Sequence, residues 1–132
     1  MLIVLWRGLL SGIPVGLLSA LVVFLGRDNV IAGGRMVEGM AKMSGSGIVT
    51  SMMAAFGGGA LVFGILSAAV YKKFFLSRFG AQAGGYFLAF ALALAVVASV
   101  LAVVSKTPFA REKVIINLIY ALGFGLLLPR FL

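Results

Sequence analysis

The chain has 132 residues, of which 63% are hydrophobic and 11% are charged, and its formal net charge is +8. Soluble domains are about 45–50% apolar and about 25% charged on similar counts, so this composition excludes an ordinary soluble domain and predicts an integral membrane protein. Cysteine and histidine are absent, which removes disulfides, thiolate metal sites, the commonest general base and the usual haem ligand. We therefore expect no enzyme activity, no metal and no cofactor.

The first predicted transmembrane span covers residues 6–26 and carries a small residue at every fourth position. These small residues are Gly8, Gly12, Gly16 and Ala20. Residues four apart lie on one face of a helix, so this glycine zipper predicts a groove that another helix can approach closely in lipid. The apolar run is longer than the roughly 7–15 residues of a signal peptide, which favours an uncleaved span. Pro14 predicts a kink, either as a tolerated bend or as a hinge.

The polar connection over residues 28–43 predicts an amphipathic helix with Asp28 as its N-cap. Its apolar face, which includes Met36 and Met40, lies opposite a charged face that includes Arg35. We expect this helix to lie on the membrane surface, where its methionines would also offer a docking face for a partner. A loosely ordered loop is the alternative, because three glycines interrupt the segment.

The second predicted span covers residues 47–71 and contains another small-residue repeat, formed by Ala60, Gly64 and Ala68. Because this repeat has the same four-residue spacing as the first, we expect the first two spans to pack closely against each other. Gly57–Gly59 fall in the middle of the span. An alternative is that these glycines unwind the helix, so that its carbonyl groups face a substrate, as in the discontinuous helices of transporters.

The third and fourth spans are predicted over residues 84–104 and 113–130. The fourth contains Asn117, the only amide expected at membrane depth, which we expect to hydrogen-bond to another helix. A polar path lined by Asn117 is the alternative. All acidic residues fall in the predicted connections, so we expect no proton relay inside the membrane. They are Asp28, Glu38 and Glu112.

Basic and aromatic residues near the span ends are expected to anchor the protein to lipid head groups. These residues are Trp6, Arg7, Lys72, Lys73, Arg78 and Arg130. Anionic lipids are a simpler partner than nucleic acid, because the basic residues are spread along the loops and helix ends. The 11 basic residues divide 5 to 6 between the two sides of the membrane, so their number does not fix the orientation. The short, acid-free connection after the second span favours a cytoplasmic position for both termini, in a prokaryotic inner membrane.

The sequence therefore predicts one all-α integral membrane domain over residues 1–132. We expect a four-transmembrane-helix bundle, with an amphipathic interfacial helix between the first two spans. The function that fits is a non-catalytic small subunit, or an assembly or stabilising partner, of a larger membrane protein complex. The alternative is a homo-oligomeric small channel or transporter, including one with dual topology. The expected partners are other membrane protein subunits or further copies of the chain, together with anionic lipids, and neither nucleic acid nor metal.

Overall fold

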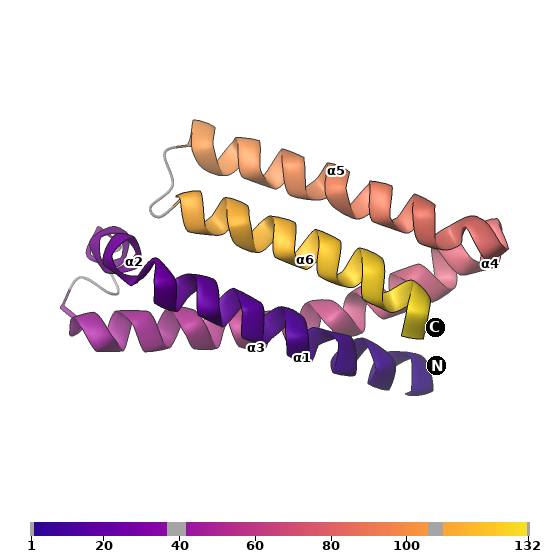
Figure 1. Ribbon diagram of the computed structural model, residues 1–132, viewed down its shortest axis with the longest axis horizontal. Coiled ribbons are helices and arrows are strands. Elements are labelled where there is room, and N and C mark those ends of the chain that lie inside the picture. Colours follow the sequence, from indigo (N-terminus) through magenta and orange to yellow (C-terminus); the bar gives the residue numbers. More distant parts are fainter. Residues whose placement is uncertain (1, 37–41, 106–109, 132) are drawn as a thin grey trace.

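A computed structural model describes residues 2–36, 42–105 and 110–131 (Figure 1). Its elements are α1 (Leu2–Leu25), α2 (Arg27–Gly34), α3 (Gly45–Val70), the π-helix η1 (Tyr71–Leu76), α4 (Ser77–Phe79), the 3-10 helix η2 (Gly80–Gln82), α5 (Ala83–Val104) and α6 (Ala110–Phe131). No strand occurs within these residues. The predicted all-α class is confirmed.

Three continuous helical stretches of the described chain are long and apolar enough to cross a membrane. They are Leu2–Leu25, Gly45–Val104 and Ala110–Arg130. The second stretch is 60 residues long, and Figure 1 shows that it folds back on itself, with α3 and α5 running in opposite directions. Gly80 in the turn has a φ of 57°, a left-handed conformation that costs glycine nothing because it has no Cβ. The apolar helices predicted from composition are therefore present.

The four long helices form two pairs, with α3 packed on α1 and α5 packed on α6. The pairs meet mainly where α1 packs against α6, and α3 makes a smaller contact with α6. Both chain ends and the α3–α5 turn lie at one end of the molecule, and α2 lies at the other. α3 and α5 belong to different pairs and make little direct contact with each other.

The α1–α3 interface is a contact between backbones, because glycines of α1 face small residues of α3. A Cβ atom added at Gly12 would lie 2.6 Å from the carbonyl oxygen of Ala60. A Cβ atom added at Gly8 would overlap the carbonyl oxygen of Gly64. Real Cβ atoms essentially never come this close to backbone atoms, so any larger residue at these positions would push the two helices apart.

Two expectations for the second span and its preceding connection change in the structure. α3 is a continuous helix through Gly57–Gly59, so the alternative of an unwound segment there is wrong. The helix expected over residues 28–43 ends at Gly34 in α2, and Gly26 rather than Asp28 stands at its N-cap position. A Cβ atom at Gly34 would lie 2.6 Å from Cγ2 of Ile48, so α2 packs on the start of α3. Of the residues discussed for this connection, Glu38 and Met40 lie outside the described residues.

The expectation that every acidic residue lies in a connection is wrong for Glu112. α6 begins at Ala110, so Glu112 lies in its first turn, where the side chain is only 2% exposed. Asp28 lies in the first turn of α2, within the connection between α1 and α3 where it was expected. The macrodipole of a helix favours negative charge in the first turn, which explains why both carboxylates are compatible with helix.

Candidate functional site: the groove between α3 and α5

An open groove of about 740 Å³ lies between α3 and α5, with α6 as its floor. Its aromatic lining residues are Phe56, Phe63, Phe87, Phe90, Tyr120 and Phe124. Its small lining residues are Ala55, Gly59, Ala91, Ala95, Ala98 and Ala121. Ligand pockets in proteins typically have volumes of about 300–1,000 Å³ and predominantly apolar walls, and the groove meets both criteria. It is therefore large enough to receive side chains or a ligand from outside the chain.

The groove is open because α5 packs mainly on α6 and on the turn before it. Only Ala83, Phe87 and Ala95 of α5 are buried. α5 contacts α6 closely at Gly125, where an added Cβ atom would lie 2.5 Å from Cδ1 of Leu88 and 3.2 Å from its Cα atom. Most of the remaining α5 surface is aliphatic and exposed, as at Val96, Val97, Val100, Leu101 and Val103. An apolar face of this size requires lipid or another protein against it.

The polar groups in the groove are largely occupied by contacts between helices. The Tyr120 hydroxyl donates a hydrogen bond to the carbonyl oxygen of Phe56, which connects α6 to α3. The Tyr120 ring also packs edge-on against Phe63, with ring centroids 5.5 Å apart. Asn117 Nδ2 donates to Ser99 Oγ at 3.5 Å, which connects α6 to α5. No charged side chain lines the groove in the described part of the chain, so the groove is suited to an apolar occupant.

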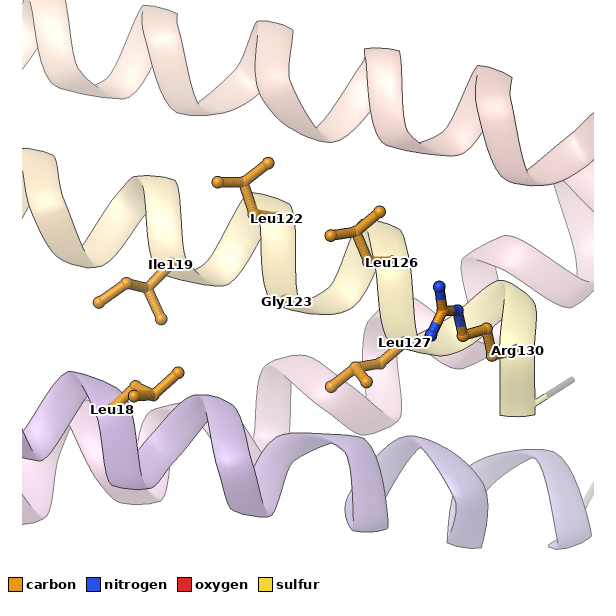
Figure 2. Close-up of a pocket in the computed structure, with 7 residues that line it drawn as sticks. All are labelled: Leu18, Ile119, Leu122, Gly123, Leu126, Leu127 and Arg130. Atoms are coloured by element: carbon orange, nitrogen blue, oxygen red, sulfur yellow. The ribbon is translucent and has the colours of Figure 1, made fainter.

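A smaller pocket of about 420 Å³ lies between α1 and α6 (Figure 2). Its lining residues are Leu18 from α1 and Ile119, Leu122, Gly123, Leu126, Leu127 and Arg130 from α6. Gly123 sets the approach of the two helices, because a Cβ atom there would lie 2.5 Å from Cγ2 of Val15. Figure 2 shows the Arg130 guanidinium turned back along α6 towards Leu126 and Leu127. This pocket therefore differs from the groove by carrying one positive charge at its end.

A buried carboxylate lies at the opposite end of α6. Glu112 Oε1 accepts hydrogen bonds from Asn29 Nδ2 at 3.2 Å and from Arg111 Nη2 at 3.0 Å. Its Oε2 atom is buried and has no hydrogen-bond partner among the described residues. Gly26 leaves room for the carboxylate, because a Cβ atom there would lie 2.6 Å from Oε1. Sequence reasoning missed this cluster. An acid and an arginine side by side at the start of a predicted span were the signal for it.

Most of the small residues that the sequence analysis singled out for packing face one another between α1 and α3. From α1 these are Gly8, Gly12, Gly16 and Ala20, and from α3 they are Ala60, Gly64 and Ala68. Gly8 faces both Gly64 and Ala68, and a Cβ atom at Gly16 would lie 2.7 Å from the carbonyl oxygen of Gly57. Ala20 is only half-buried. The contact surface therefore runs over the first three positions of the α1 repeat.

The residues assigned to head-group anchoring gather near one end of the molecule, where the two chain ends and the α3–α5 turn lie (Figure 1). They are Trp6, Arg7, Lys72, Lys73, Arg78 and Arg130, and all six are exposed. Lys73 Nζ lies 5.6 Å from the ring centroid of Phe74, within reach of a cation–π contact. Asn117 is not part of this group and lies in the groove.

Comparisons of the chain with protein-family models, with curated proteins and with solved structures gave no match.

Proposed function

We propose that the protein is a non-catalytic integral subunit, or an assembly or stabilising partner, of a larger membrane protein complex. In this proposal α1, α3, α5 and α6 are four transmembrane helices. They contain 24, 26, 22 and 22 residues, and about 20 apolar residues are enough to cross a bilayer. The reversal of direction between α3 and α5 supports counting their common helical stretch as two spans.

The observation that carries the proposal is the uncharged groove with small side chains on both walls. Ala55 and Gly59 line it from α3, and Ala91, Ala95 and Ala98 line it from α5. Helices associate in lipid through close van der Waals contact, which small residues permit. The groove is therefore a receptor for an apolar transmembrane helix of another subunit, which would complete the packing of α5.

Four spans mean that both termini and the α3–α5 turn lie on the same side of the membrane. We assign this side to the cytoplasm of a prokaryotic inner membrane. The turn contains Lys72, Lys73 and Arg78 and no acidic residue, and short basic loops favour the cytoplasmic side. In the same orientation α2 lies at the opposite membrane surface.

The test is to fill the groove and measure the loss of a partner. Ala98 and Val97 are adjacent and both exposed, but only Ala98 lines the groove. The variants Ala98→Phe and Val97→Phe therefore place the same ring inside and outside the groove. Each protein would be extracted in mild detergent from its native membrane and analysed by native mass spectrometry.

We expect the unmodified protein and Val97→Phe to carry one or more foreign membrane subunits, and Ala98→Phe to lose most of them. A mass spectrum that contains only the chain itself, as monomer or multimer, would contradict the proposal. Equal retention of the partner by Ala98→Phe and Val97→Phe would remove the groove as its binding surface.

One observation favours a second candidate function, a homo-oligomeric small channel or transporter. Buried ionisable residues in membrane proteins frequently mark ion pathways, and Glu112 is buried with one carboxylate oxygen unpartnered among the described residues. Under this alternative the purified protein would be a pure homo-oligomer. It would also conduct ions in liposomes, and Glu112→Gln would change the flux.

A further inference from the structure

The pocket between α1 and α6 combines an apolar wall with one charge at its end. Leu18, Ile119 and Leu122 line one part of it, and Arg130 lines the end nearest the chain termini (Figure 2). The Arg130 side chain is exposed and forms no hydrogen bond or ion pair with the residues that the structure describes. A guanidinium is a preferred donor to phosphate, because two of its N–H groups match two phosphate oxygens.

The length of the pocket matches one leaflet of a bilayer. From Ile119 to Arg130 it follows α6 for about 16 Å, at a rise of 1.5 Å per residue. This is about half of the roughly 30 Å hydrocarbon core of a membrane. A ligand that fills the pocket would therefore extend from the head-group level, where Arg130 lies, to near the middle of the bilayer.

We propose that this pocket is a specific site for one anionic phospholipid, with an acyl chain along Leu18, Ile119 and Leu122 and its phosphate at Arg130. An apolar helix of a partner fits the pocket less well, because it would cover the Arg130 guanidinium without supplying a counter-charge. The neutral groove between α3 and α5 carries no such penalty. The inference rests on the membrane location proposed above but not on the partner subunit.

The test is native mass spectrometry of the detergent-purified chain with three added probes. These are phosphatidylglycerol, phosphatidylcholine with the same acyl chains, and glycerol phosphate, which has the phosphate and no acyl chain. The unmodified protein is expected to retain one phosphatidylglycerol in preference to phosphatidylcholine, and no glycerol phosphate. Equal retention of glycerol phosphate would overturn the proposal in favour of a site for the free anion.

Arg130→Gln tests the charge, with Arg78→Gln as its matched control at the same end of the molecule. Arg78 is also exposed but does not line the pocket. Arg130→Gln should bind phosphatidylglycerol roughly ten-fold more weakly, the change expected from one lost charge-assisted contact. Arg78→Gln should bind it normally. If both variants lose the same affinity for phosphatidylglycerol, the net charge of the protein explains the loss, and the proposal is overturned.

Leu122→Phe tests the acyl-chain position, with Leu118→Phe as its control. Both leucines are exposed on α6, but only Leu122 lines the pocket. Leu122→Phe should lower retention of both phospholipids several-fold, whereas Leu118→Phe should leave it unchanged. Unchanged retention in Leu122→Phe, with helix content preserved, would overturn the assignment of the chain to this pocket. The two proposals fail separately, because none of these variants alters the groove and Ala98→Phe does not alter this pocket.

Discussion

The two helix pairs use glycine in different ways. Between α1 and α3, the glycines meet backbone, as where Gly12 faces the carbonyl of Ala60. Between α5 and α6, Gly125 receives the side chain of Leu88. Backbone contact fixes the distance between α1 and α3, since a carbonyl cannot rotate away. At Gly125 the nearest atom belongs to a side chain that can rotate, and the Leu88 Cα atom lies farther away, at 3.2 Å from an added Cβ. We therefore expect α5, the helix beside the open groove, to be held less firmly than α3. We therefore expect α1 and α3 to form a rigid pair, and α5 and α6 to form a more adjustable pair.

The largest effect should come from Gly12→Leu, which breaks the rigid pair. The leucine side chain would occupy the position of the α3 backbone, and overpacking typically costs about 1–3 kcal/mol or more. Resistance to unfolding by sodium dodecyl sulfate, followed by fluorescence of the single tryptophan Trp6 on α1, measures the loss. Gly58→Leu is the matched control, because a Cβ atom at Gly58 meets nothing within 4 Å. If both variants resist unfolding equally, backbone contact is not what holds α1 to α3.

A smaller effect is expected for Gly125→Ala in the adjustable pair. The added Cβ would lie 2.5 Å from Cδ1 of Leu88, whose side chain can turn away at the cost of a strained rotamer, about 0.5–1.5 kcal/mol. It would also lie 3.2 Å from the Leu88 Cα atom, so the helices would have to shift slightly as well. The same unfolding assay applies, with Gly85→Ala as control because its Cβ would meet open space. A loss as large as that of Gly12→Leu would show that both pairs are equally rigid.

The smallest effect is expected for Tyr120→Phe, which removes one link between the pairs. It deletes the hydrogen bond from the Tyr120 hydroxyl to the Phe56 carbonyl and keeps the ring contact with Phe63. Hydrogen bonds between membrane helices contribute about 0.6 kcal/mol on average. Tyr86→Phe removes an exposed hydroxyl and serves as the control in the same assay. Unfolding of Tyr120→Phe at a much lower detergent concentration would make this bond the main connection between α3 and α6.

The helices themselves could be predicted from the sequence because their signals are local. The lengths of the apolar runs, compared with the thickness of a bilayer, predicted spans that start at residues 6, 47, 84 and 113. In the structure the corresponding helices α1, α3, α5 and α6 begin at Leu2, Gly45, Ala83 and Ala110. The four-residue spacing of Gly8, Gly12 and Gly16 likewise defines one helix face without knowledge of the fold.

The groove and the Glu112 cluster could not be predicted, because both depend on which helices meet. The groove exists only because α5 packs on α6 rather than on α3. The Glu112 carboxylate is buried because Asn29 and Gly26, more than 80 residues earlier, lie against it. No pattern near Glu112 contains that information, and the predicted start of the fourth span at residue 113 left this residue outside the helix.

The pairing of α1 with α3 has a consequence for the order of events during synthesis. The rigid pair uses only residues up to Val70, so it can form while the rest of the chain is still being made. At about 5–20 residues per second, the last helix is completed roughly 3–12 s later. During this interval the face of α1 that later contacts α6 has no partner within the chain. An insertion factor, a chaperone or a lipid has seconds in which to occupy it, and α6 must then displace that occupant.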